Sequence, residues 1–122
     1  MKDYSNQDLR GVNFKDQDLR GANFEGSQLG TADFDRADLR GANFHRANCF
    51  LVSFCGANLE NTNFEDATVT GSLVNTNLEN ANFKNAWMAD VSIWGTTGDA
   101  DFEGADMRRA WTSPYDPTKP IA

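Results

Sequence analysis

The side chains best suited to metal binding or nucleophilic chemistry are one histidine, His45, and two cysteines, Cys49 and Cys55. Thiolates and imidazoles are the ligands of structural zinc, and a thiol beside an imidazole is a common catalytic pair. Two thiols make neither a disulfide framework nor, by themselves, a structural zinc site. These three residues therefore predict no metal site and no cofactor site.

Carboxylates are the other candidates for chemistry, because paired Asp and Glu side chains serve as general acids and bases. They recur at positions where Asn stands elsewhere, as Asp33 and Asn43 illustrate, and this exchange indicates turn and backbone-capping roles. No glycine-rich segment precedes a helix with Lys, as a phosphate-binding loop requires. The sequence predicts no catalytic residue, and we expect the protein not to be an enzyme.

The chain carries an internal repeat with a period of five residues. A small or polar residue, most often Ala, stands two positions before each apolar centre, and Asp or Asn stands one position before it in most repeats. The period slips by one residue after Val69 and again after the 95–99 stretch, and counting the centres gives twenty repeats. The centres are Leu9, Phe14, Leu19, Phe24, Leu29, Phe34, Leu39, Phe44, Cys49, Phe54, Leu59, Phe64, Val69, Leu73, Leu78, Phe83, Met88, Ile93, Phe102 and Met107.

A period of five matches neither an α-helix nor a flat strand. It fits a chain that turns a corner once per repeat, with the central residue and the small residue both facing inward. Four such sides close a square. In that register Cys49 points into the core and Cys55 points out from the next side, which argues against a disulfide between them.

The segments Ala22-Asn23-Phe24-Glu25-Gly26, Ala37-Asp38-Leu39-Arg40-Gly41 and Ala57-Asn58-Leu59-Glu60-Asn61 resemble the signature of the pentapeptide-repeat family. The resemblance implies an all-β fold, a right-handed quadrilateral parallel β-helix with four repeats per coil and about five coils. At about 4.8 Å per coil the rod would be about 24 Å long. We expect the β-helix to span 1–111 and a Pro-rich capping or disordered tail to span 112–122, with Trp111 or Tyr115 covering the last coil.

Residues twenty apart should stack above one another in such a coil. Inward columns are then expected at Leu9, Leu29, Cys49 and Val69, and opposite them at Leu19, Leu39 and Leu59. Two columns of stacked Phe are expected between these, and an amide ladder is expected at Asn23, Asn43, Asn63 and Asn82. His45 should face outward with no partner that makes it special.

Five large apolar residues break the rule that outward positions are polar: Phe50, Leu51, Val74, Trp87 and Trp94. On a square coil they fall on two adjoining faces of the C-terminal half. An exposed apolar patch with aromatic anchors is typical of an interface. The sequence therefore predicts a protein interface or a self-association surface there, with cover for the slip or for the tail as the alternative interpretation.

The formal net charge of -7 disfavours direct binding to nucleic-acid phosphates. No apolar stretch resembles a signal peptide or a membrane span, so we expect a cytoplasmic protein, or a periplasmic or thylakoid-lumen protein if a leader was removed. The leading hypothesis is a non-enzymatic protein-interaction module, monomeric or weakly dimeric, of unknown partner. The alternative, implied by the resemblance, is an acidic DNA mimic that binds DNA gyrase or another DNA-binding protein. The resemblance also makes a cyanobacterial source plausible.

Overall fold

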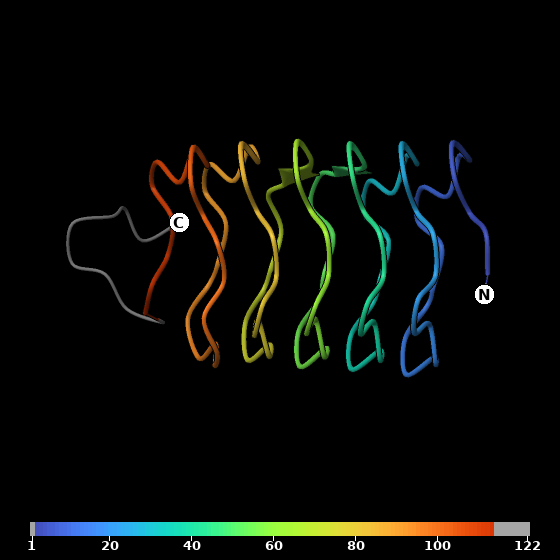
Figure 1. Ribbon diagram of the computed structural model, residues 1–122, viewed down its shortest axis with the longest axis horizontal. Coiled ribbons are helices and arrows are strands. Elements are labelled where there is room, and N and C mark those ends of the chain that lie inside the picture. Colours follow the sequence, from blue (N-terminus) through green and yellow to red (C-terminus); the bar gives the residue numbers. More distant parts are fainter. Residues whose placement is uncertain (1, 114–122) are drawn as a thin grey trace.

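The chain winds into a stack of four-sided coils along one axis, from the N-terminal end to the C-terminal end (Figure 1). A computed structural model describes residues 2–113. Successive coils pair through parallel bridges between residues twenty apart, such as Asn23 with Asn43, and nineteen apart after the first slip, such as Asn63 with Asn82. The predicted right-handed quadrilateral β-helix is confirmed.

The four faces are defined by their inward columns. Face 1 has Tyr4, Phe24, Phe44, Phe64, Phe83 and Phe102. Face 2 has Leu9, Leu29, Cys49, Val69, Met88 and Met107. Face 3 has Phe14, Phe34, Phe54, Leu73 and Ile93. Face 4 has Leu19, Leu39, Leu59, Leu78 and Gly98. The two strands, β1 (Asn48–Cys49) and β2 (Thr68–Val69), pair in parallel on face 2.

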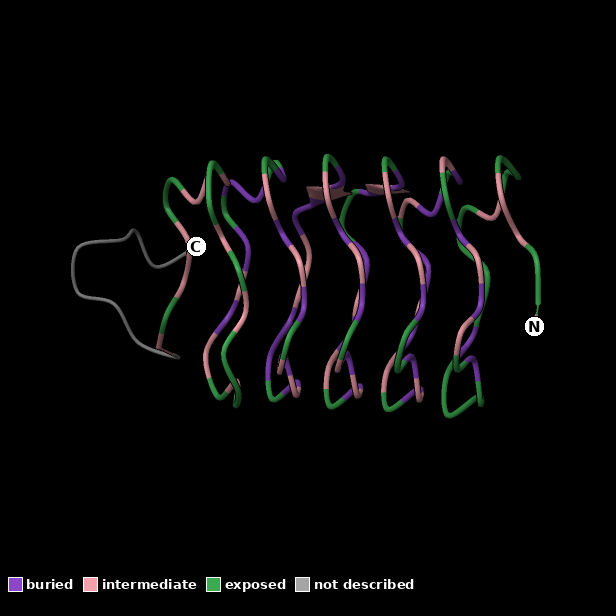
Figure 2. Cartoon of the chain, viewed as in Figure 1, coloured by how far each residue is buried: buried purple, intermediate pink, exposed green. Residues whose placement is uncertain are grey.

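The core consists of the inward columns together with the small residue of each repeat, and both are buried along the inside of the middle coils (Figure 2). In the end coils Tyr4, Leu9, Phe102 and Met107 are partly buried and pack against this core. Phe24 and Phe44 stack on face 1 with ring centroids 4.8 Å apart, and Phe34 stacks on Phe54 across 5.1 Å on face 3. Rings from the two columns meet edge to face, as Phe24 and Phe34 do at 5.4 Å. The predicted Phe columns and Leu columns are confirmed, and truncation of a central Phe to Ala should cost about 3–5 kcal/mol.

Each corner is turned by the second residue after the centre, which adopts the left-handed conformation, as at Gly41 with φ 72° and Asn61 with φ 60°. Asx turns hold the sides: the Asn23 side chain accepts a hydrogen bond from the Glu25 backbone N–H at 3.0 Å. This bonding replaces most of the predicted amide ladder. Among the ladder members only Asn43 donates to its neighbour Asn23, at 3.3 Å.

Two sides, 67–70 and 96–99, have four residues instead of five and lack the corner residue. After the first, Gly71 takes the place of the usual inward Ala, and an added Cβ would collide with the Val52 backbone. In the second, Gly98 itself occupies the centre, and its Cβ would lie 2.6 Å from the Glu79 backbone nitrogen. Glycine is required at both because a shortened side draws neighbouring backbones together.

The sequence count of twenty repeats misses two centres. Tyr4 is a centre of the first coil, and its ring stacks on Phe24 at 4.9 Å. Gly98 is a centre without a side chain. The final bridge of the described chain pairs Ser92 with Trp111. The predicted tail spans 112–122, and its part after residue 113 lies outside the described residues. No helix long and apolar enough to cross a membrane occurs between residues 2 and 113.

Candidate interaction site

The first shortened side opens a depression at the corner between faces 2 and 3. At an ordinary corner, the N–H of the turning residue donates to the next coil's backbone, as Thr31 N does to the Phe50 carbonyl at 2.9 Å. At the shortened side, Leu51 N instead donates to the Thr70 hydroxyl at 3.1 Å. The space that a corner residue would fill lies between Leu51 and Asp90.

We call this depression the apolar notch. It has a volume of about 270 Å³ and is lined by Phe50, Leu51, Thr70, Trp87, Ala89, Asp90 and Arg109. The lining comes from four successive coils, because β1 pairs with β2, Thr68 pairs in turn with Trp87, and Trp87 pairs with Asp106 in the coil that contributes Arg109. Phe50, Leu51 and Trp87 are 52%, 55% and 49% exposed. The notch therefore presents three large apolar side chains to solvent around one hollow.

Leu51 is held in the left-handed conformation, with φ 56°. The corners of the other coils carry mostly Gly, Asn or Asp, which adopt this conformation more readily. A left-handed conformation costs a residue with a Cβ about 1–2 kcal/mol. Neither burial nor backbone geometry favours leucine at this corner, so the requirements of the fold do not explain why leucine is there.

Charged groups form the C-terminal rim of the notch. Arg109 Nε lies 3.0 Å from Asp90 Oδ1, and the Arg108 guanidinium lies 5.6 Å from the centroid of the Trp87 ring. Arg108 also pairs with Asp106 at 2.7 Å, and this hydrogen bond holds the pKa of Asp106 below its usual range. The rim therefore carries charges of both signs, with the Arg108 guanidinium beside the Trp87 ring.

The structure brings together three of the five apolar residues singled out in the sequence. Val74 is 8% exposed, so the prediction that it is part of an exposed patch is wrong. Backbone hydrogen bonds place it in one face 3 column, with Cys55 and Trp94 at the same position of the neighbouring coils. Trp94 is half-buried on face 3, outside the notch. The interface role of Phe50, Leu51 and Trp87 stays a prediction.

Sequence reasoning missed four lining residues: Thr70, Ala89, Asp90 and Arg109. The signal that could have found them is the four-residue step from Val69 to Leu73. A missing corner exposes the sides of the residues in the coils above and below it. Polar and small residues can therefore line the notch even though they fit the repeat pattern and do not stand out in the sequence.

The cysteines and the histidine are not among the residues that line the notch. Cys49 is buried, which raises the pKa of its thiol well above the ordinary value, and both cysteines are free. Cys55 is half-buried rather than a fully exposed thiol, with its Sγ 3.1 Å from Ser72 Oγ. Within residues 2–113, no three His, Cys, Asp or Glu side chains cluster as metal ligands would.

His45 also differs from the expectation drawn from the sequence. Its Nδ1 lies 3.0 Å from Glu25 Oε1, and its Nε2 lies 3.5 Å from Asp66 Oδ2. The ring thus links carboxylates of the two neighbouring coils, and the prediction that His45 has no special partner is wrong.

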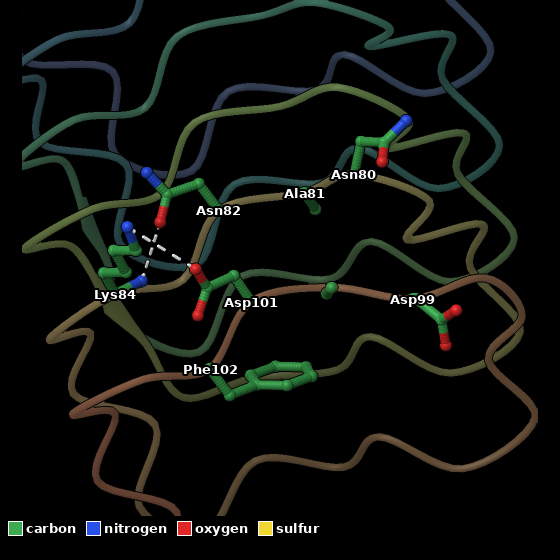
Figure 3. A pocket seen from close by; sticks show the side chains of 8 residues that line it. Asn80, Ala81, Asn82, Lys84, Asp99, Asp101 and Phe102 are labelled. Atoms are coloured by element: carbon green, nitrogen blue, oxygen red, sulfur yellow. Dashed lines mark hydrogen bonds and ion pairs between the residues drawn. The ribbon is translucent and has the colours of Figure 1, made fainter.

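The second shortened side produces a depression of its own, which we call the polar notch (Figure 3). Its volume is about 590 Å³, and it is lined by Asn80, Ala81, Asn82, Lys84, Asp99, Ala100, Asp101 and Phe102. Lys84 Nζ lies 3.5 Å from Asp101 Oδ2, and Asp99 N donates to Glu79 Oε2 at 3.0 Å. These polar groups bond to one another.

Comparisons with known proteins agree with the fold. The family model for pentapeptide repeats matches residues 5–35, 18–48 and 32–71, with eight copies of its unit. No curated protein is similar enough in sequence to count as a relative.

Several solved structures are similar in shape. HetL, a pentapeptide-repeat protein involved in heterocyst differentiation regulation in the cyanobacterium Nostoc, is 23% identical with a TM-score of 0.56, and the match covers 89% of this chain and 56% of HetL. Rfr23 from the cyanobacterium Cyanothece is 20% identical with a TM-score of 0.54, over 89% of this chain and 86% of Rfr23. QnrB1, a plasmid-mediated fluoroquinolone resistance protein, is 19% identical over 93% of this chain and 78% of QnrB1, with a TM-score of 0.39.

Proposed function

This chain belongs to the pentapeptide-repeat family, and from that premise we propose that it is a non-enzymatic protein-interaction module whose binding surface is the apolar notch. Proteins of this family are generally structural modules rather than catalysts. The site's chemistry supports the same role, because the notch offers apolar and aromatic surface with a charged rim. Such surfaces bind other proteins through a few buried anchors.

The main observation behind the proposal is that the neighbouring residues Phe50 and Leu51 are both exposed. Two adjacent apolar side chains, each more than half exposed, stand where most other repeats place polar residues or Gly. One of them occupies a corner conformation that leucine adopts at a cost. Exposure and backbone cost together lower the stability of the free protein, and burial against a partner offsets both.

The test is affinity capture from a lysate of the source organism, with three forms of the protein as bait. The native chain is compared with Phe50→Ser/Trp87→Ser, and with Lys84→Ser/Asp101→Ser as the matched control in the polar notch. We expect the bound protein to be retained by the control and lost by Phe50→Ser/Trp87→Ser, with all three baits folded by circular dichroism. Equal capture by the native chain and Phe50→Ser/Trp87→Ser would contradict the proposal.

The alternative of an acidic DNA mimic has less support. Acidic residues on face 4 sit beside arginines of the same side: Asp18 pairs with Arg20 at 2.8 Å and Asp38 with Arg40 at 2.6 Å. Paired charges of this kind interrupt the continuous negative surface that a DNA mimic needs. Inhibition of gyrase supercoiling by micromolar protein would favour this alternative.

A further inference from the structure

We infer that the apolar notch binds a second copy of this chain, face 2 against face 2, with the two-fold axis parallel to the coil axis. This inference rests on the proposed function, because it names the occupant of the same site.

Face 2 presents two outward columns on either side of its inward one. The column before the centre holds Asp8, Gln28, Asn48, Thr68, Trp87 and Asp106, and the column after it holds Arg10, Gly30, Phe50, Thr70, Ala89 and Arg108. Between its two ends the face carries no charged side chain in these columns, and Phe50, Trp87 and Ala89 are its apolar members. Each end carries one ion pair, Asp8 with Arg10 and Asp106 with Arg108, both at 2.7 Å. In both pairs the acid is in the first column and the base in the second.

This charge order distinguishes the two ways in which identical faces can meet with two-fold symmetry. An axis parallel to the coil axis keeps each level and exchanges the columns, so Asp8 faces Arg10 of the second copy. An axis perpendicular to the coil axis keeps the columns and reverses the levels, so Asp8 faces Asp106 of the second copy. The first arrangement sets opposite charges against each other at both ends, and the second sets like charges together.

Side-chain size favours the same arrangement. Trp87 and Ala89 lie at one level in opposite columns, so exchanging the columns places each Trp87 against Ala89 of the second copy. The hollow beside Ala89 is the apolar notch, with Leu51 on one flank. A Trp side chain buries about 150–250 Å² when it is covered, and it does so here twice per dimer. The fit of a large side chain against a small one at this level therefore favours the same axis as the opposite charges at the two ends.

The first experiment is sedimentation velocity over a concentration series of the native chain and of Leu51→Asn/Trp87→Ser. We expect the native chain to dimerise reversibly at concentrations up to about 1 mM and the variant to stay monomeric. A monomeric native chain over that range overturns the inference. In that case the capture experiment decides the proposed function separately. If the native chain captures a protein that Phe50→Ser/Trp87→Ser does not, a different partner occupies the notch and the proposed function stands. A dimer that persists in Leu51→Asn/Trp87→Ser uses another surface and also overturns the inference.

The second experiment tests the orientation by exchanging charges. The variant Asp8→Arg/Arg10→Asp/Asp106→Arg/Arg108→Asp keeps an ion pair at each end but reverses its order. In a mixture with the native chain, native mass spectrometry should show both homodimers, with the mixed dimer depleted about tenfold below its statistical share. A mixed dimer at its statistical share, or enriched as the perpendicular axis requires, would overturn the inference.

Discussion

The apolar notch and the polar notch arise from the same backbone event and differ in what lines them. Each follows a four-residue side that lacks its corner residue and uses a glycine where backbones approach closely. In the polar notch the lining is largely polar and includes the ion pair of Lys84 with Asp101. In the apolar notch Phe50, Leu51 and Trp87 remain exposed. A shortened side therefore makes a hollow, and the side chains around it decide whether the hollow is a candidate binding site.

The glycines test whether the two notches share a backbone origin. Gly71→Ala should destabilise the fold by about 3 kcal/mol, because the new Cβ collides with the Val52 backbone rather than with a movable side chain. Gly98→Ala should act in the same direction, with an added penalty from its φ of 81°. Urea unfolding of both variants measures the cost, and a loss below about 0.5 kcal/mol for either would show that its side is not held by close backbone contact.

The corner residues test what the apolar notch costs the fold. Leu51→Asn should raise the free energy of unfolding by about 1 kcal/mol, because Asn adopts the left-handed corner more readily and no buried contact is lost. Asn80→Leu at the corresponding corner of the polar notch, where φ is 59°, should lower it by a similar amount. Thermal unfolding of the pair checks both signs, and a destabilised Leu51→Asn would mean that the leucine is structural cover.

The Thr70 hydroxyl tests how the apolar notch satisfies its backbone. Thr70→Val removes the acceptor of the Leu51 N–H and should cost about 1 kcal/mol, while Thr70→Ser should restore most of it. Amide hydrogen exchange should be faster at Leu51 in Thr70→Val alone. Unchanged exchange there would show that the N–H finds water or another acceptor.

The smallest expected effect is the titration of Asp106 at the rim. Its pKa should lie below the ordinary value of 3.8, because the Arg108 side chain and backbone N–H bond to its ionised form. A depressed pKa in the folded state stabilises the fold above the ordinary value, and that contribution is lost as the pH falls through the lower, folded-state pKa. Arg108→Gln should move the pKa up, which carboxyl-detected NMR titration can follow. An unchanged pKa in Arg108→Gln would show that the pair is not formed in solution.

The fold was predictable because the five-residue period fixes which side chains face inward, and the bulky central residues report the register at almost every coil. Gly98 escaped detection because a centre without a side chain leaves no apolar mark in the sequence. Val74 was misjudged because its exposure depends on the neighbours above and below it in the column. The apolar notch was not predicted because it arises where a corner residue is missing, and a missing residue has no side chain to recognise. The charged rim of Arg108 and Arg109 was not predicted because it forms only when distant segments stack.

The most direct test of the central claim is an NMR concentration series on the native chain, repeated with any captured partner. We predict chemical-shift changes at the amides of Phe50, Leu51, Thr70, Trp87 and Ala89, with the amides of Asn80, Asn82, Asp99 and Asp101 unmoved. Shifts centred on the polar notch, or no shifts at the apolar notch while association is measured by sedimentation, would contradict the claim that the apolar notch is the interaction site.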